Sequence, residues 1–371
     1  MDKKSLLNFS KIPIKLLENR VWRTYTGGKL IDEWKGALNS SDNQYPEEWI
    51  ASTVKAKNVG REHIQDEGLT KIYTEDGSEI TLQEVINSAP EVFLGKKHTD
   101  KYGPNMAVLV KVLDSAERLA IQVHPNKEFA LNEFGSSFGK TEAWYILGGR
   151  QINGVEPYVL LGFKEGVTKE HWKALFYKQD VDGMINSLHR IAVKPGDVFL
   201  INGGVPHAIG SGCFLIEIQE PTDYTLRVEK TTPSGFRVAD SACHLGLGFD
   251  KLFDCFNYET ANYKETVSRW KLEPELIREE QGGRETVLIG RKNTDCFRMH
   301  SLEVNNKIAC SNNGVYCIAV ILEGKGSIVV DGYQMKVKQG DEFFIPASIE
   351  DITWHNEGQG DMKIILCYPP N

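Results

Sequence analysis

A short pattern that occurs twice in the chain restricts the folds that the chain can adopt. Residues 195–200 read Pro-Gly-Asp-Val-Phe-Leu, residues 339–344 read Gln-Gly-Asp-Glu-Phe-Phe, and a proline follows each copy, at Pro206 and Pro346. A Gly-Asp turn that leads into a short apolar run is typical of a strand in a small antiparallel barrel, such as a jelly roll. The repeat therefore predicts a mainly β protein with two jelly-roll barrels.

The two copies differ at the position where a functional side chain is expected. Eleven residues after each glycine, the first copy has His207 and the second has Asp351, with no replacement ligands nearby. A chain of 371 residues exceeds the usual size of one domain. We therefore predict a catalytic domain over residues 1–256 and a C-terminal β domain without metal ligands over residues 257–371.

Two parts of the catalytic domain are expected to be helical insertions, at about residues 79–100 and 168–190. Thr81 and Glu84 form a capping-box pattern at the start of the first insertion. In the second insertion, apolar residues recur at helical spacing from Trp172 onward. Both patterns predict a helical segment beside the barrels.

The strands are predicted from apolar runs. In the catalytic domain these runs cover residues 106–113, 118–124 and 213–219. Residues 257–286 are polar and predict a connection, and a block of short strands is expected over residues 287–368.

Residues 121–124 are the strand on which the expected site depends. Successive side chains of a strand point to opposite faces, so Gln122 and His124 share one face. Glu142 begins a further strand across a single loop, and His207 follows a tight Gly-Gly-Val-Pro turn. Two imidazoles, a carboxylate and an amide oxygen are the parts of a zinc or non-haem iron site.

Three further charged residues are candidates for the chemistry. Lys140 lies two residues before Glu142, where it could bind substrate or carry a proton, or be a solvated loop lysine. Glu217 lies on the strand after His207 and could pair with Lys140, Arg227 or the substrate. Arg227 is the next cation along the chain. It could pair with Glu217, or it could be a surface arginine on an edge strand.

Composition limits the partners and the compartment. The net charge of −8 argues against nucleic acid and anionic membranes, although local cations could still bind an anionic substrate. Seven cysteines without a Cys-x-x-Cys pair suggest reduced thiols in the cytoplasm. No window approaches the roughly 20 apolar residues of a membrane span.

With these residues in view, the chain resembles the class I mannose-6-phosphate isomerases of the short bacterial type, which are members of the cupin superfamily. The likeness lies in residues 109–114, 117–125, 139–147 and 205–210. It implies two cupin-like barrels, a helical part and one zinc ion per chain. Carried over residue by residue, it implies zinc ligands at Gln122, His124, Glu142 and His207, an active-site arginine at Arg227, and further pocket residues at Lys140 and Glu217.

The resemblance also implies an activity, the reversible isomerisation of mannose 6-phosphate and fructose 6-phosphate through an enediolate. Glu217, Lys140 and a metal-bound water all fit the role of the base that moves the proton. The expected partner is a small sugar phosphate, and the expected protein is a monomer or a homodimer.

The chain departs from the family pattern at two places. Ala120 stands where the family usually has a hydroxyl residue, and residues 228–232 replace a stretch rich in Tyr and Asp. These departures leave open an isomerase that acts on another sugar or sugar phosphate. Two further alternatives are a non-haem iron oxygenase, which also uses two His and a carboxylate, and a non-catalytic cupin that binds sugar.

Overall fold

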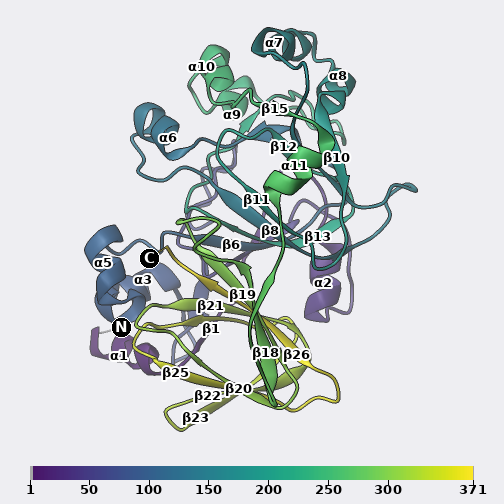
Figure 1. The fold of residues 1–371 in the computed structure, drawn as a ribbon. Helices are drawn as coiled ribbons and strands as arrows, with labels where there is room; N and C mark the ends of the chain where they lie inside the picture. The colour runs from purple at the N-terminus through teal and green to yellow at the C-terminus, as the bar shows by residue number, and fades with distance from the viewer. Residues whose placement is uncertain (1–2, 371) are drawn as a thin grey trace.

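The computed structural model describes residues 3–370, which form two pairs of packed β-sheets with helices at their edges (Figure 1). The predicted mainly β class is confirmed. We number the four large sheets 1 to 4, and a separate small sheet pairs β4 (Lys71–Tyr73) with β5 (Glu79–Thr81).

Sheets 1 and 2 form the first barrel-like unit. Sheet 1 contains, in spatial order, β16 (Lys271–Leu272), β11 (Val198–Ile201), β8 (Glu142–Gly149), β13 (Cys213–Gln219), β6 (Leu109–Asp114), β3 (Glu47–Ile50) and β2 (Arg20–Val21). Sheet 2 contains β10 (Leu188–Ala192), β9 (Tyr158–Lys164), β12 (His207–Ile209), β7 (Gln122–Val123) and β14 (Leu226–Arg227), with β15 (Thr260–Ala261) beside β9.

Sheets 3 and 4 form the second unit. Sheet 3 contains β1 (Ile14–Lys15), β24 (Glu342–Ile345), β21 (Cys317–Glu323), β26 (Met362–Tyr368), β19 (Arg298–Val304), β18 (Gly283–Ile289) and β17 (Glu275–Glu280). Sheet 4 contains β20 (Lys307–Ser311), β25 (Asp351–Asn356), β22 (Lys325–Val330) and β23 (Tyr333–Lys338).

The sheets stack in the order 2, 1, 3, 4. The strands of the two central sheets are therefore buried on both faces. In β13, Leu215 packs toward sheet 2, whereas Ile216 and Ile218 pack in a core shared with sheet 3. In β26 of sheet 3, Ile365 lies in that shared core and Ile364 packs toward sheet 4. The two units therefore share one continuous hydrophobic core.

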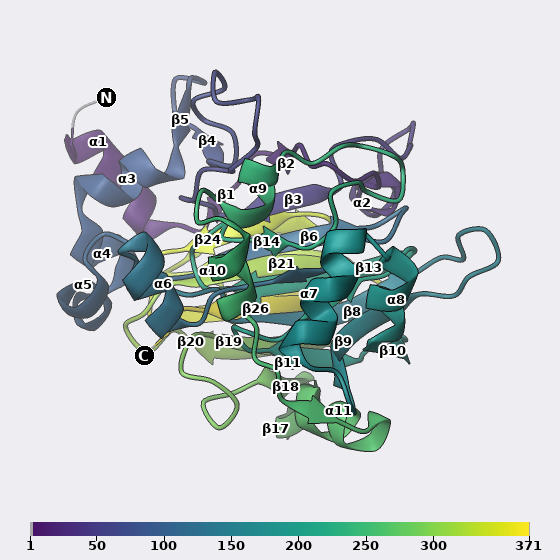
Figure 2. The same ribbon diagram turned by 90° about the horizontal axis from the view of Figure 1, so that it is seen from above.

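Helices cover the outer face of sheet 2 and one end of the shared core, as Figure 2 shows from above. The first group packs on sheet 2 and contains α7 (Lys169–Lys178), α8 (Val181–Asn186) and α10 (Phe249–Asp254). The second contains α3 (Leu82–Ser88) and α4 (Pro90–Leu94), followed by α5 (Lys96–Tyr102). The others are α1 (Lys3–Leu7), η1 (Asn8–Lys11), α2 (Lys29–Lys35), α6 (Lys127–Phe134), α9 (Asp240–His244) and α11 (Tyr263–Trp270).

Side chains fix the starts of these helices. Thr81 and Glu84 form the capping box that the sequence predicts at the start of α3. The second helical pattern is divided into α7 and α8 because Gln179 has a left-handed backbone, with φ of 50°, and Asp180 caps the next helix.

The sequence repeat corresponds to equivalent turns in the two units. Gly196 and Gly340 have φ of 91° and 84°, a conformation that glycine adopts without strain. Asp197 and Asp341 each accept a hydrogen bond from the backbone N–H three residues earlier. Each turn leads into a strand, β11 or β24, and the next strand begins at His207 in sheet 2 and at Asp351 in sheet 4.

Two predictions about strands were wrong in extent. The expected strand over residues 118–124 is reduced to the two residues of β7, because the N–H of Ile121 donates to the Glu229 carboxylate at 2.6 Å instead of to a strand. The expected connection over residues 257–286 contains β15, α11, β16, β17 and the start of β18. The edge strand β17 is almost entirely exposed, so its polar composition resembles that of a loop.

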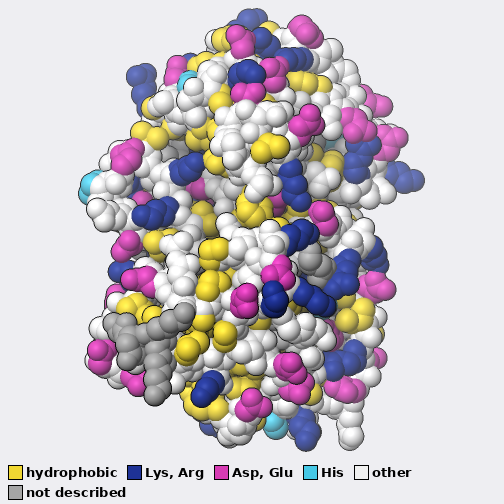
Figure 3. Space-filling model, turned by 90° about the vertical axis from the view of Figure 1, so that its left-hand side faces the viewer, with side chains coloured by type: hydrophobic (Ala, Val, Ile, Leu, Met, Phe, Trp, Pro, Cys, Tyr) yellow, Lys and Arg dark blue, Asp and Glu magenta, His cyan; other side chains and the backbone are white. Residues whose placement is uncertain are grey.

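The chain crosses between the two units more than once. After residue 257, β15 and β16 still pair with sheets 2 and 1. Near the N-terminus, β1 pairs with β24 of sheet 3. In residues 3–370 no helix has the length and apolar character that crossing a membrane requires. On the face shown in Figure 3, acidic and basic side chains are interspersed.

A buried group of three charges links sheets 1 and 3. The Lys35 ammonium, at the end of α2, lies 3.3 Å from the Glu48 carboxylate of β3 and 3.1 Å from the Glu342 carboxylate of β24. Burial raises the pKa of Glu342 to about 8, although Lys35 acts in the opposite direction. Two carboxylates share one ammonium, and burial raises the pKa of Glu48 as well, so this group of three retains a proton at neutral pH.

This proton makes the stability depend on pH. The pKa of Glu342 is raised from its ordinary 4.5 in the folded protein. The contribution of its proton to the free energy of unfolding is therefore complete below pH 4.5 and is lost as pH rises to about 8. We expect Glu342→Gln, which mimics the protonated form, to gain stability relative to the wild type over this interval. The difference in free energy of unfolding between the variant and the wild type should change with pH by at most about 1.4 kcal/mol per pH unit. Urea unfolding at several pH values measures it, and a pH-independent difference would contradict the assignment.

Candidate metal centre

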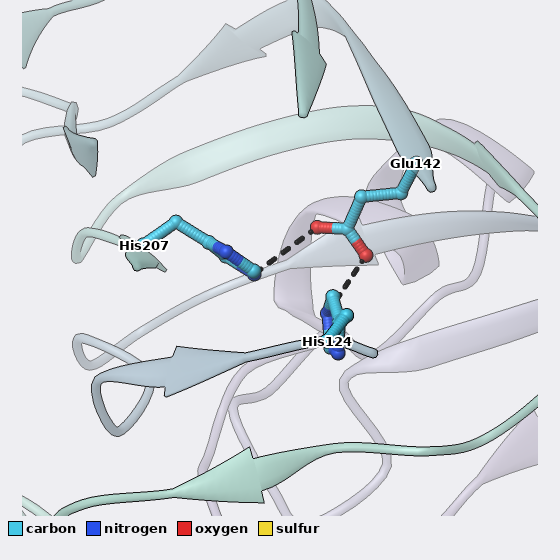
Figure 4. A group of neighbouring side chains, drawn as sticks. All are labelled: His124, Glu142 and His207. Carbon is cyan, nitrogen blue, oxygen red and sulfur yellow. Dashed lines mark ion pairs between the residues drawn. The ribbon is translucent and has the colours of Figure 1, made fainter. Parts of the chain in front are cut away.

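Two histidines and a glutamate converge between sheets 1 and 2 (Figure 4). His124 follows directly after β7, and His207 begins β12, the neighbouring strand of sheet 2. Glu142 is the first residue of β8 and comes from sheet 1. All three side chains are buried. Segments that are distant in the sequence thus supply one compact cluster.

The distances within the cluster suit a metal ion. Nε2 of His124 lies 3.0 Å from Oε2 of Glu142, and Nε2 of His207 lies 3.3 Å from Oε1. Potential ligand atoms of the three residues all lie within 4.8 Å of one another. Three protein ligands at such spacing are characteristic of a catalytic zinc site, in which one position is left for substrate.

Backbone carbonyls orient both imidazoles. Nδ1 of His124 lies 2.9 Å from the carbonyl oxygen of Tyr224, and Nδ1 of His207 lies 2.9 Å from that of Val205. A carbonyl can only accept, so each Nδ1 carries the proton and donates it. Each Nε2 therefore directs a free lone pair toward Glu142, as metal-binding histidines do.

The charge states also suit a cation. Burial, followed by the positive charge of Lys140, lowers the pKa of His124 to about 3, so its imidazole is neutral. Burial alone would raise the pKa of Glu142, but the positive charge of Lys140 outweighs it and holds that pKa well below its ordinary range. Oε1 of Glu142 has no hydrogen-bond partner among the described residues. A buried anionic oxygen of this kind fits a metal ligand.

Gln122 and Lys140 lie at the same cluster. Nε2 of the Gln122 amide is 3.3 Å from Nε2 of His207, and half a turn of the amide exchanges its nitrogen and oxygen. The Lys140 ammonium lies 2.7 Å from Nε2 of His124 and contacts Oε2 of Glu142. The four predicted ligand residues and Lys140 are therefore brought together.

Glu217 and Arg227 line an inner cavity of about 40 Å³ that also borders Gln122 and Lys140. The Glu217 carboxylate accepts hydrogen bonds from the Lys111 ammonium at 2.8 Å and from the Trp144 indole at 3.2 Å. All seven predicted site residues thus lie in the cluster or around the adjoining cavity.

Arg227 is half-buried and differs from the buried ions of this region. Its guanidinium donates to two backbone carbonyls, at 3.2 and 3.3 Å, and within residues 3–370 it forms no ion pair. Burial lowers its pKa, and Asp223 opposes this effect. A half-buried guanidinium with no carboxylate partner among the described residues is a candidate to bind an anionic ligand.

Sequence reasoning missed four charged residues of the inner cavity. Arg23 pairs with Glu47 at 3.0 Å and with Asp223 at 3.2 Å, and Lys111 pairs with Glu217. Lys111 could have been found, since a lysine within the apolar run of β6 must face another charge. Arg23 and Glu47 lie in a part of the chain with no periodic pattern, and Asp223 resembled a turn residue.

A cation and the Lys140 ammonium should compete for Nε2 of His124, because one lone pair cannot serve both. We expect Lys140→Met to bind zinc at least about tenfold more tightly, since a positive charge beside the site disappears. A chelator-competition titration measures this affinity. Lys173→Met, on α7 where the lysine pairs with Asp250 of α10, removes the same charge outside the cluster and serves as the control. An unchanged or weaker zinc affinity in Lys140→Met would contradict the competition between the metal ion and Lys140.

Two family models match the chain. The phosphomannose isomerase type I catalytic domain matches residues 33–137, and the mannose-6-phosphate isomerase cupin domain matches residues 291–369. The probable mannose-6-phosphate isomerase GmuF of Bacillus subtilis is 29% identical over 78% of this chain and 82% of its own length. The mannose-6-phosphate isomerase of Streptococcus mutans is 26% identical over 79% of this chain and 85% of its own length.

Solved structures share the fold. The mannose 6-phosphate isomerase of Bacillus subtilis superposes with a TM-score of 0.73 at 22% identity, over 96% of this chain and 99% of that one. A point mutant of the Salmonella typhimurium phosphomannose isomerase superposes with a TM-score of 0.73 at 16% identity, over 97% of this chain and 100% of that one. Both family models and the curated relatives point to the type I phosphomannose isomerases, and the chain is similar to that family.

Proposed function

We propose that this protein is a zinc-dependent isomerase that interconverts mannose 6-phosphate and fructose 6-phosphate. The observation that carries the proposal is the buried cluster of His124, Glu142 and His207 beside a cavity lined by Lys140 and Arg227. The relatives named mannose-6-phosphate isomerase support the choice of substrate.

The proposed ligands of the zinc ion are His124, Glu142 and His207, with the Gln122 amide oxygen as the fourth. When bound, the ion acts as a Lewis acid that polarises the substrate carbonyl. The orphaned Oε1 of Glu142 and the inward Nε2 atoms of the histidines support this ligand set.

The reaction moves a proton between two neighbouring carbon atoms of the sugar, and Glu217 is our candidate for the group that carries it. Its carboxylate lines the inner cavity, and Lys111 and Trp144 hold it in one orientation. A positioned base of this kind typically contributes about 10²–10⁴ in rate. Lys140 is placed to donate a hydrogen bond to the developing enediolate oxygen, and Arg227 to bind negative charge on the substrate.

The cysteines support a cytoplasmic location for this enzyme. All seven are free thiols, and six of them are buried. Buried thiols without disulfide partners suit a reducing compartment.

Activity should depend on both the metal and the cluster. In a coupled assay for fructose 6-phosphate, we expect a chelator to abolish turnover and zinc to restore it. His207→Ala should lower kcat at least about a hundredfold, because one ligand and the orientation of Glu142 are lost. His171→Ala, at an exposed position on α7, is the matched control. Full activity and full zinc content in His207→Ala would defeat the assignment.

Glu217→Gln separates proton transfer from binding. We expect kcat to fall about 10²–10⁴-fold, with zinc content retained, since the amide cannot accept the proton. Incorporation of solvent deuterium at C1 or C2 of the sugar should fall equally. If exchange continues at the wild-type rate, Glu217 is not the base, and Lys140 and a metal-bound water remain as candidates.

A related isomerase with another substrate is the second candidate. Ala120 lines the inner cavity, so no hydroxyl meets the substrate at that point. A panel of hexoses and hexose phosphates, each tested with the zinc-loaded protein, distinguishes the two. A higher kcat/KM for another sugar than for mannose 6-phosphate would favour this second candidate.

A further inference from the structure

A second, larger cavity opens beside the inner one. We call it the outer chamber; its volume is about 760 Å³, and its walls come mainly from residues 55–67 and 236–245. Arg23, Asp223 and Arg227 line both cavities. The inner cavity, at about 40 Å³, is far below the roughly 300–1,000 Å³ of small-molecule sites. A sugar phosphate that reacts at the cluster must therefore extend into the outer chamber.

The outer chamber is positively charged, although the whole chain carries −8. Six of its lining residues are lysine or arginine, and three are acidic. A concave site with an excess of one charge concentrates ligands of the opposite charge. The chamber is thus suited to an anion.

The cations of the chamber differ in whether an acidic residue already neutralises them. Arg61 pairs with Glu67 at 2.8 Å, and Arg23 pairs with Glu47 and Asp223. In the described part of the chain, the lining cations without an ion pair are Lys55, Lys57, Arg227 and Arg237. These four have charge available for a ligand.

Lys57 and Arg237 stand on the two different segments that wall the chamber. The Lys57 ammonium lies 4.2 Å from the centre of the Tyr224 ring, and the carbonyl of Tyr224 is the group that orients His124. Arg237 follows Phe236, whose ring meets Trp22 edge to face at 5.9 Å. An apolar wall beside these cations suits a sugar that ends in a charged group.

The inner cavity offers less to a phosphate. Its Lys111 is already held by Glu217 at 2.8 Å and faces Glu47 at 3.7 Å, and Ala120 offers no hydroxyl. Lys140 is engaged with the metal cluster. Apart from Arg227, which lines both cavities, the unpaired cations therefore lie on the outer side, at the end of the substrate farthest from the reacting carbon atoms.

We propose that the outer chamber binds the phosphate group of the substrate through Lys57 and Arg237, with Arg227 at the junction between the chambers. This assignment rests on the proposed function, because it takes the substrate to be a hexose 6-phosphate. Charge-assisted hydrogen bonds from an ammonium and a guanidinium hold the phosphate oxygens. The sugar then extends inward to the cluster, with its C1 and C2 nearest the zinc ligands.

The test uses the full zinc-loaded chain with Lys57→Met, Arg237→Gln and the double variant. Each single change should raise KM for mannose 6-phosphate about tenfold and the double change about a hundredfold, with kcat nearly unchanged. The affinity for inorganic phosphate, measured by calorimetry, should fall in parallel. Lys173→Met, with the same loss of charge on α7 outside the outer chamber, should alter neither quantity.

The outcomes separate this inference from the proposed function. Wild-type turnover of mannose 6-phosphate together with an unchanged KM in the double variant would overturn the phosphate site and leave the isomerase intact. Phosphate binding that is lost in the double variant, in a protein that does not turn over mannose 6-phosphate, would support the site and overturn the proposed substrate. A fall in kcat without a rise in KM would also contradict a role in phosphate binding.

Discussion

Pairing of opposite charges inside the first unit is the interaction on which the candidate site depends. Arg23, Glu47, Lys111, Glu217 and Asp223 are all buried, and burial of a lone ion costs several kcal/mol. Each of these ions has at least one partner of opposite sign within 3.2 Å. The network holds these side chains in fixed positions and lowers the pKa values of Glu47 and Asp223, mainly through the charge of Arg23. It leaves Arg227 as the half-buried cation that a ligand can engage.

Much of the site could be predicted because its signals are local. Alternation along residues 121–124 places Gln122 and His124 on one face, and the turn before His207 aims its ring inward. Alternation also places Glu217 on the inner face of β13, where it meets Lys111. The pairing of strands that brings Glu142 between the histidines is a long-range feature, and the resemblance to a family supplied it.

The remaining parts of the fold and of the site could not be predicted from the sequence, for physical reasons. The outer chamber is built by irregular segments, whose course depends on side-chain contacts such as that of Lys57 with Tyr224. The strand β17 has polar residues on both faces, so no alternation marks it. The charge group of Lys35, Glu48 and Glu342 joins residues from three separate elements. No pattern within any one of these elements indicates the other two.

The N-terminal strand has a consequence for how the chain is made. Ile14 pairs with Phe344, so the first strand has no partner until residue 344 has been synthesised. The shared core between sheets 1 and 3 likewise needs residues from both halves. The nascent N-terminal half therefore emerges with an unpaired strand and uncovered apolar side chains, surfaces of the kind that make an incompletely folded chain prone to aggregation.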